Sequence, residues 1–470
     1  MSTDYSRARR TPPVHVASAA VLLAVVMLVS GCSYIDMVRR HRRLREAFEK
    51  QPRLGLVQEF APEECLQIVG GLLTDPTRDE PLAIIALSQL YARNEVVGWR
   101  MVPGAVGYYS VLLPEGTYDL LVFADLNRDD QFGDDEVVGR MELGARLVVS
   151  RAQAADGFFV AGPTLRLDYA HPSVEDLPVP IKVAVNDHVV ISLDDELFDP
   201  GYGLMGLYNP SKLLEQTQGY FFGLEPFDEE KTQVLFVHGA TGTPRNWKYL
   251  VDGLDRSQFQ PWFFYYPSGL PLDRTGAILA QSIVRIAASP RLHLERLIIV
   301  AHSMGGLVAR SALNRLSVPS KPTYLKMFIS LSTPYGGHDA ARAAVEHAPD
   351  VIPSWYDLAP GSPYLRTLTA SPLPPDLPFF LLFGYANPGR VHFGPSNDGV
   401  VTIRSELDLA VHLPATHSYG FDVSHDEILE NATVRDVFNE LIATAAPPHG
   451  VLDDPLGTVQ RVFTSSLRGQ

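Results

Sequence analysis

Cysteine is almost absent from this chain of 470 residues, which contains only Cys32 and Cys65. Two cysteines alone give no disulfide framework to read and no zinc-ligand spacing. Cys65 has mostly apolar neighbours, which is typical of a small core residue. A chain of this length is also too long for one ordinary core, which predicts two domains.

Basic residues are also scarce, because 39 lysines and arginines stand against 54 aspartates and glutamates, for a formal net charge of −15. This excess argues against nucleic-acid binding and repels anionic surfaces at long range. The exception is the basic segment Arg39–Arg45. Two interpretations remain open for it: contact with anionic lipid head groups, or a solvated helix face.

The apolar run Val16–Val29 is too short for a comfortable membrane span. Arginines precede it and the small residues Ser30 and Gly31 follow it. A basic start, a short apolar stretch and a small-residue end are typical of a secretory signal peptide, here residues 1–31. The alternative is an uncleaved signal anchor.

The ending Val29-Ser30-Gly31-Cys32 resembles a bacterial lipobox. The resemblance implies cleavage before Cys32 and lipid on its thiol and its new amino group. Two or three acyl chains would hold the protein stably on a membrane. Residues 32–53 would then be the lipid anchor and a charged, helix-prone stalk. Ser33, by resemblance to sorting in Gram-negative bacteria, is compatible with the outer membrane, so the expected location is the bacterial cell envelope.

The most informative stretch is Leu297–Arg310, in which an apolar β-run ends in a turn and a helical pattern follows at once. This is the context of a nucleophile elbow. Ser303 would occupy the strained corner, and Gly305 and Gly306 would leave room for close packing. Ala301 replaces the usual first glycine. Taken alone, the stretch also fits a buried strand followed by a serine that caps a helix.

A serine nucleophile needs a base, and the base needs an acid that orients it. In hydrolases with such an elbow the chain order is Ser, acid, His. Asp398 lies downstream in an Asn-Asp-Gly turn that follows a strand-like run, and His425 precedes the last helical pattern. We take Ser303, Asp398 and His425 as the catalytic candidates, with His417 as the runner-up for the base.

The segment 232–244 predicts a strand that runs into a small-residue loop at His238-Gly239. Two backbone N–H groups aimed at a developing oxyanion stabilise the transition state by several kcal/mol. The expected donors are the N–H groups of Ala240 and of Met304, the residue after the serine. The alternative is a plain strand and turn with structural glycines.

These motifs together resemble the α/β-hydrolase superfamily: His238-Gly239, Ala-His-Ser-Met-Gly-Gly at 301–306, Asn-Asp-Gly-Val-Val at 397–401, and the late His425. The alanine-first elbow is similar to that of certain bacterial lipases, and Trp355–Leu365 also resembles a stretch of lipase-like members. The resemblance covers about residues 228–445 and implies a serine esterase or lipase without a required cofactor. It identifies the fold and the triad but is a poor guide to the substrate.

Apolar runs alternate with helical patterns such as 277–286 in this part of the chain. The runs lie near 233–237, 261–266, 297–301, 325–332, 378–384 and 407–413. Such alternation predicts an α/β domain with a mostly parallel sheet between helices, over residues 228–446, before a C-terminal tail at 447–470. We expect an insert at about 338–377, with Trp355, Tyr356 and Tyr364, to form a lid or acyl-chain wall. The alternative is a loop that only seals the core.

Residues 54–170 instead show short β-rich runs separated by turns. The runs 107–113 and 117–123 flank a Pro-Glu-Gly turn and predict a hairpin, whereas 82–87 fits a strand or a helix. This spacing predicts a small all-β sandwich-like module and resembles fibronectin-like and transthyretin-like modules. Residues 171–227 are expected to be a linker that packs on the hydrolase, with one strand near 181–185.

An acidic loop in the β-module has the ligand spacing of an EF-hand calcium loop. Its oxygen-bearing residues are Asp125, Asn127, Asp129, Gln131 and Glu136. Asp130 replaces the usual glycine, a strand precedes the loop, and no helix pattern follows. The loop is therefore either a structural calcium site or an acidic turn without metal.

The sequence as a whole predicts an exported, membrane-anchored serine hydrolase. Its substrates would be carboxylic esters, with lipid or acyl esters expected, cleaved through a Ser-His-Asp triad and an acyl-enzyme. The alternatives are an acyltransferase or an amidase with the same triad, and a non-catalytic surface-binding lipoprotein. The expected partners are the substrate and the membrane, and no motif indicates an oligomeric state.

Overall fold

The computed structural model describes most of the chain from residue 65 to residue 446 and a short N-terminal segment. The described residues are 33–39, 42, 65–75, 78, 80, 82–90, 93–102, 107–127, 131–132, 135–142, 145–154, 159–172, 181–182, 191–217, 221–288, 294–318, 320–386 and 396–446. The expected signal peptide, Cys32 and the tail 447–470 lie outside them. None of the helices within these ranges is long and apolar enough to cross a membrane.

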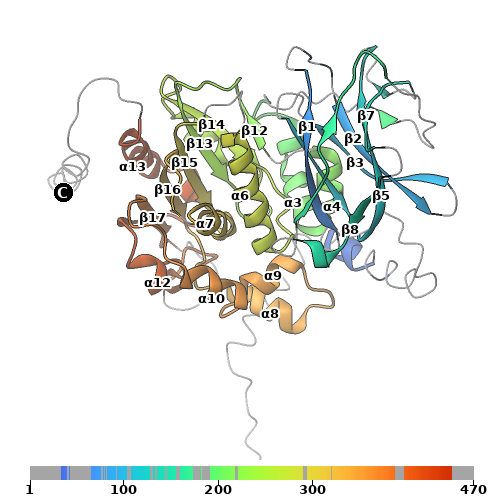
Figure 1. The fold of residues 1–470 in the computed structure, drawn as a ribbon. Helices are drawn as coiled ribbons and strands as arrows, with labels where there is room; N and C mark the ends of the chain where they lie inside the picture. The colour runs from blue at the N-terminus through green and yellow to red at the C-terminus, as the bar shows by residue number, and fades with distance from the viewer. Residues whose placement is uncertain are drawn as a thin grey trace, which may run out of the picture.

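Two regions lie side by side, a β-module and an α/β region (Figure 1). The strands of the β-module are β1 (Leu66–Leu73), β2 (Leu82–Leu90), β3 (Arg93–Val102), β4 (Tyr108–Leu113), β5 (Gly116–Ala124), β6 (Gln131–Phe132), β7 (Val137–Arg140), β8 (Leu147–Val149), β9 (Phe159–Ala161), β10 (Leu165–Arg166) and β11 (Ile181–Lys182). One sheet has the order β10-β1-β4 with β9 also on β1, and another has the order β3-β2-β5-β7 with β8 on β5. A shared apolar core includes side chains of both sheets, and Cys65 is buried directly before β1.

The strands on either side of Pro114 do not form a hairpin. β4 pairs with β1, whereas β5 pairs with β2, so the predicted hairpin is wrong although both strands exist. The short link between them carries the chain from one sheet to the other. Val111 of β4 and Leu120 of β5 thereby face one common core. The Tyr118 hydroxyl donates a hydrogen bond to the Pro114 carbonyl at 3.0 Å and holds this corner.

The α/β region is built on one seven-stranded sheet. Its strands are β12 (Phe221–Gly223), β13 (Thr232–Val237), β14 (Phe259–Phe264), β15 (Leu297–His302), β16 (Leu325–Leu331), β17 (Phe379–Gly384) and β18 (His417–Phe421). The order is β12-β14-β13-β15-β16-β17-β18, and only β12 runs antiparallel to its neighbour. Because β12 belongs to it, the sheet begins ahead of the expected domain boundary at residue 228.

Helices cover both faces of this sheet, which explains why every residue of β13 and β15 is buried. The helices are α3 (Pro200–Tyr208), α4 (Pro210–Thr217), α5 (Lys248–Asp252), α6 (Leu272–Ala288), α7 (Met304–Leu316), α8 (Asp339–His347), α9 (Pro353–Leu358), α10 (Pro363–Ala370), α11 (Ile403–Glu406), α12 (Leu409–His412) and α13 (Ala432–Ala443). Side chains of α6, α7 and α10 share one core with Ile299, and those of α5 and α13 share the other with Val300. The expected insert holds α8, α9 and α10, which form a row along the lower edge in Figure 1.

The strand predicted near 407–413 is wrong. These residues form α12, and the strand that completes the sheet is β18, His417–Phe421. The Asp408 carboxylate accepts the Ala410 N–H at 3.0 Å and so caps a helical turn. Leu409 and Leu413 are 69% and 76% exposed, so this apolar run is not a core strand.

The segment directly after Cys32 packs on the α/β region. Residues 33–39 are helical, and Tyr34 and Met37 are buried in a small cluster with Tyr208 and Ile352. The Tyr34 hydroxyl donates to the Asp350 carbonyl at 2.9 Å. The part of the expected stalk that the structure describes is therefore docked on the α/β region.

Candidate active site

Ser303 lies between β15 and α7 in a strained conformation. Its φ is 53° and its ψ is −132°, values that a residue with a side chain rarely adopts. Strain of this kind is concentrated at functional sites. A Cβ on Gly305 would clash with the carbonyl oxygens of Val237 and His238, and one on Gly306 would clash with the side chain of Thr333. The prediction that these two glycines permit close packing is confirmed.

The structure brings Ser303, His425 and Asp398 together. His425 Nε2 lies 2.9 Å from Ser303 Oγ, and His425 Nδ1 lies 2.5 Å from Asp398 Oδ2. Asp398 and His425 follow β17 and β18, and the carboxyl ends of these parallel strands meet the end of β15 at one edge of the sheet. The backbone N–H of His425 donates to the Asp398 carbonyl at 2.9 Å, which ties the two loops together.

Asp398 is held as a carboxylate by several donors. Its Oδ1 accepts the N–H groups of Val400 at 2.9 Å and Val401 at 2.6 Å. Burial raises the pKa of Asp398, but the hydrogen bond and charge of His425 and these two N–H groups outweigh burial, so the pKa lies below its usual range. The acid can therefore orient His425 and stabilise its protonated form.

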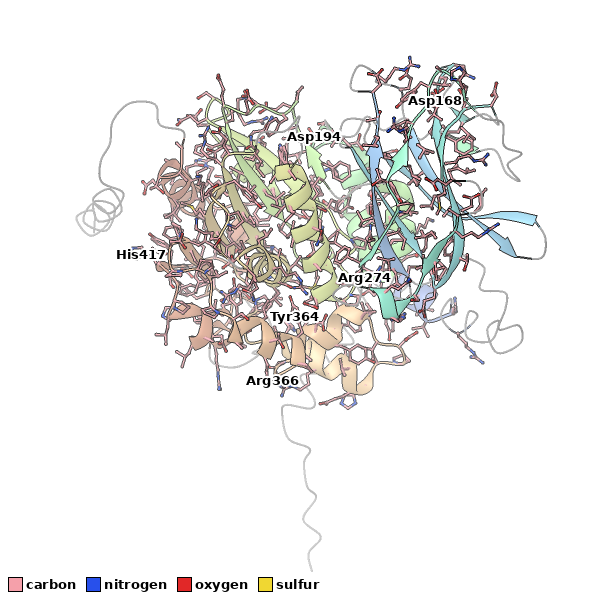
Figure 2. All side chains as sticks on the ribbon, viewed as in Figure 1. Asp168, Asp194, Arg274, Tyr364, Arg366 and His417 are labelled. Atoms are coloured by element: carbon pink, nitrogen blue, oxygen red, sulfur yellow. The ribbon has the colours of Figure 1, made fainter. Side chains whose placement is uncertain are left out.

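His417, the runner-up for the base, lies elsewhere. It begins β18 at the edge of the sheet, and its exposed ring lies at the outer surface of the molecule (Figure 2). The Ser303 hydroxyl instead donates its hydrogen bond to His425 Nε2. The geometry therefore favours His425 as the base.

The loop after β13 approaches Ser303 closely. A Cβ on Gly239 would lie 2.8 Å from the Ser303 Cβ, so only a glycine lets this backbone pass. Ala240 is the next residue in this loop, and Met304 begins α7. The connection that leaves β13 runs toward one edge of the sheet, and the connection that leaves β15 runs toward the other edge. In sheets of this kind, ligands usually bind at the carboxyl ends of the two strands where the direction changes.

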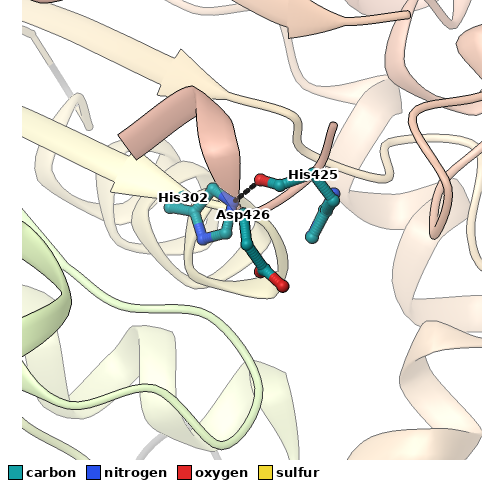
Figure 3. Close-up of side chains that lie close together, drawn as sticks. All are labelled: His302, His425 and Asp426. Atoms are coloured by element: carbon teal, nitrogen blue, oxygen red, sulfur yellow. Dashed lines mark hydrogen bonds between the residues drawn. The ribbon is translucent and has the colours of Figure 1, made fainter. Parts of the chain in front are cut away.

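His238 and His302 are buried neighbours of the site that the sequence interpretation missed. His238 Nδ1 donates to the Gly239 carbonyl at 2.8 Å, and its Nε2 accepts the Tyr266 N–H at 3.2 Å. His302 Nε2 donates to the His425 carbonyl at 3.0 Å, as the dashed line in Figure 3 shows. Burial lowers the pKa of His238 to about 4 and that of His302 to about 3, so both rings are neutral near pH 7.

A third histidine of this kind, His338, holds the loop of Asp398. Its Nδ1 accepts the Ala340 N–H at 3.1 Å, and its Nε2 donates to the Val400 carbonyl at 2.8 Å. Burial lowers its pKa as well. Each of the three rings therefore holds a backbone carbonyl in a different loop of the site.

Glu406, at the end of α11, was also missed. It is 2% exposed. It lies in one cluster with Asp398 and His425, in which one side-chain oxygen or nitrogen atom from each residue is within 4.8 Å of the others. Burial raises the pKa of Glu406 to about 10, and the charge of Asp398 adds to this rise. An acid in a short polar segment gives no sequence signal for such a position.

Two clusters of potential metal ligands occur among the described residues, and both include His425. They are His302 with His425 and Asp426, and Asp398 with Glu406 and His425. His425 already bonds to Ser303 and Asp398 through its two ring nitrogens, and His302 Nε2 points to a carbonyl (Figure 3). The hydrogen bonds of the candidate triad therefore account for these groupings.

The acidic loop of the β-module lies at the end of β5. Glu136 Oε1 accepts the N–H groups of Leu126 at 2.8 Å and Asn127 at 3.2 Å, and both Asp125 and Glu136 are buried. Asp129 lies outside the described residues, as does the side chain of Gln131. This bonding closes the loop through one oxygen of Glu136, which competes with the bidentate ligation of an EF-hand glutamate.

The strand order and the Ser303 elbow define the class of the second region, an α/β-hydrolase fold. Residues 228–348, from β13 to α8, match the family described as "Putative serine esterase (DUF676)". This match includes Ser303 and supports a serine hydrolase that acts on esters. A comparison with curated proteins gave no match.

Several solved structures are similar to this chain, among them a lipase and a phospholipase. The mature lipase BlEst2 of Bacillus licheniformis is 21% identical, over 47% of this chain and 98% of its own, with a TM-score of 0.38. The lin2722 product of Listeria innocua is 14% identical, over 48% of this chain and 97% of its own, with a TM-score of 0.35. Phospholipase PlaB of Legionella pneumophila is 18% identical, over 37% of this chain and 45% of its own, with a TM-score of 0.30.

Proposed function

We propose that this protein is a serine hydrolase that cleaves carboxylic esters, with lipid or acyl esters as its substrates. The proposal rests on one observation: Ser303, His425 and Asp398 are joined by hydrogen bonds, and the backbone of Ser303 is strained. A hydroxyl, a base and a buried acid in this order are what acyl transfer through a serine requires.

In the proposed mechanism Ser303 Oγ attacks the ester carbonyl, and His425 Nε2 takes its proton. The N–H groups of Ala240 and Met304 hold the oxyanion, while Asp398 stabilises the protonated His425. His425 then gives the proton to the leaving alcohol, and an acyl-enzyme forms. Water attacks this acyl-enzyme with His425 as the base, releases the acid and restores Ser303. These steps require no cofactor, and the acidic loop of the β-module remains a proposal for structural calcium only.

The insert of α8, α9 and α10 is proposed to form a wall for the acyl chain. It begins at His338, whose ring bonds to the loop of Asp398. The Asp357 carboxylate accepts the Leu272 N–H at 2.7 Å, and the Tyr364 hydroxyl donates to the Leu307 carbonyl at 2.9 Å. These bonds fasten the insert to α6 and α7, which favours a fixed wall over a lid that swings open.

We further propose that the protein is exported and acylated at Cys32, which places it in the bacterial cell envelope. The docking of Tyr34 and Met37 on the α/β region supports a short tether. If Cys32 carries lipid, the acyl chains begin one residue before this docked segment. The hydrolase would then be held close to the membrane, where lipid esters are found. Fatty-acid labelling that persists after Cys32→Ser would contradict this proposal.

The test of the catalytic proposal uses a fluorophosphonate probe and a panel of esters of increasing acyl length. Wild type should be labelled, and Ser303→Ala should lose both labelling and hydrolysis, by roughly 10⁴-fold or more. Ser311→Ala, a buried serine of the same helix α7, is the matched control and should keep both. Labelling that survives in Ser303→Ala would remove the assignment. Absence of labelling in wild type would instead favour the non-catalytic alternative. Cleavage of amide substrates would indicate the amidase, and transfer of the acyl group to an added alcohol would indicate the acyltransferase.

A further inference from the structure

Glu406 is a second carboxyl group in the candidate triad, and the fold holds it there firmly. Glu406 is the last residue of α11. The hydroxyl of Ser405, the residue before it, donates to the Gly337 carbonyl at 2.6 Å. The Gly336 N–H donates to the Ser405 carbonyl at 2.9 Å. The side chain of Glu406 is therefore carried into the site by backbone contacts with the loop after β16.

Among the described residues, the polar groups that face Glu406 are Ser332, Asp398 and His425, and none of them is a lysine or an arginine. Ser332 lies at the end of β16, Asp398 lies in the loop after β17, and His425 lies in the loop after β18. His338 reaches the loop of Asp398 from the insert. Within the described residues Glu406 forms no ion pair with a lysine or an arginine, and neither of its carboxyl oxygens has a hydrogen bond of good geometry. Two buried carboxylates that no lysine or arginine of the described residues pairs with repel each other, so one of them must keep its proton.

The hydrogen bonds decide which carboxyl keeps the proton. Asp398 accepts three N–H groups, from His425 Nδ1, Val400 and Val401, and all of them stabilise a negative charge. Glu406 accepts none of these. Of the two acids, Asp398 is therefore the carboxylate and Glu406 the neutral acid. The rise in the pKa of Glu406 to about 10 agrees with this assignment.

We propose that Glu406 is a positioning residue, a neutral carboxylic acid that donates its proton in a hydrogen bond to Asp398 and so fixes the carboxylate toward His425. This inference rests on the proposed function, because Asp398 is taken as the acid of the triad. If Glu406 is neutral, the pair of Glu406 and Asp398 carries a single negative charge in the resting state. Glu406 can hold Asp398 in place without adding a second negative charge that would change the basicity of His425.

The experiment compares wild type with Glu406→Gln and Glu406→Met in the full chain. Glutamine keeps the shape and an N–H donor without a charge, whereas methionine keeps only the volume. Wild type should show the infrared carbonyl band of a protonated carboxylic acid at pH 7, and this band should be absent from Glu406→Gln. In the pH profile of kcat/KM, the fall at low pH (the acid limb) should have the same midpoint in Glu406→Gln as in wild type. The kcat of this variant should remain within about threefold of wild type. Glu406→Met should lose roughly tenfold or more in kcat without a lower melting temperature, because a hydrogen bond to a charged group is lost.

Other results would overturn the proposal. If Glu406 is ionised, the carbonyl band is absent from wild type, and Glu406→Gln moves the acid limb to lower pH because a charge that favours protonated His425 is removed. If Glu406 only fills space, Glu406→Met is as active as Glu406→Gln. Should Glu406→Met fail to fold, the band and the acid limb in Glu406→Gln still decide. A wild type without esterase activity would refute the proposed function, while the infrared band would still report whether Glu406 holds a proton.

Discussion

Replacing Glu406 with glutamine changes one buried carboxyl into an amide of nearly the same shape, and its effect on stability can be worked from the structure. The pKa of Glu406 is raised from 4.5 to about 10, chiefly by burial. The folded protein therefore keeps a proton that the unfolded chain releases above pH 4.5. For a raised pKa, the contribution to stability is fully present below the unfolded value and is lost as the pH rises toward the folded value.

The size of the effect follows from the same shift. Between the two pKa values, each rise of one pH unit lowers the unfolding free energy of wild type by about 1.4 kcal/mol. Roughly three units above pH 4.5, wild type has therefore lost about 4 kcal/mol. Glutamine does not titrate and avoids this cost. The stability of Glu406→Gln relative to wild type should therefore grow with pH from about 5 to about 9.

Guanidinium unfolding at a series of pH values measures this difference. Trp247, which is 1% exposed in the core of the α/β region, reports the unfolding by its fluorescence. The matched control is Glu430→Gln, an exposed glutamate, which should show no such trend. If the difference between wild type and Glu406→Gln is the same at every pH, Glu406 does not keep its proton in the folded state and the reasoning is refuted.

Four further predictions address the site and the β-module. His425→Ala should lower ester turnover by roughly 10⁴-fold and His417→Ala by less than about threefold, and the reverse order would show that the base is misassigned. Gly305→Ala should lower both kcat and the melting temperature because its Cβ meets the carbonyls of Val237 and His238, whereas Gly201→Ala, with nothing within 4 Å, should be tolerated. Because burial lowers the pKa of His302 below 6.5, the folded protein should lose stability as the pH falls from 6.5 toward about 3, and His302→Gln should flatten that loss in melting curves. If the acidic loop binds calcium, millimolar calcium should raise the melting temperature and Asp125→Ala should cancel the rise, whereas calorimetry without heat would leave an acidic turn closed by Glu136.

The sequence predicted those elements whose signal is local and strong. The largely apolar runs at 232–237, 297–302 and 379–384 are strands, because strands covered on both faces contain few polar residues. Chain order, together with the expected position of Asp398 after a strand and of His425 before the last helix, predicted that both residues share one site with Ser303. The failures have physical causes: α12 is a short apolar run on the surface, and the pairing of β4 and β5 depends on partners distant in sequence.

The supporting residues of the site could not be predicted for a different reason. The protonation states of His238, His302 and Glu406 result from burial in the folded protein. In the sequence His302 is only the variable residue before the serine of the elbow. Glu406 is only an acid in a short polar segment. Nothing local indicates that either side chain is inaccessible to water.

Burial has opposite effects on the pKa values of these groups and the same effect on their charge. It lowers the pKa of His238 and His302 and raises that of Glu406, so all three are neutral near pH 7. In the proposed mechanism positive charge develops on His425 and negative charge on the ester oxygen. Such changes are best stabilised by fixed dipoles that need not reorganise. The neutral rings hold backbone carbonyls of the loop after β13 and of the His425 loop, and Glu406 lies beside Asp398. The fold therefore surrounds the pair of Asp398 and His425 with neutral groups that fix its position without competing for its proton.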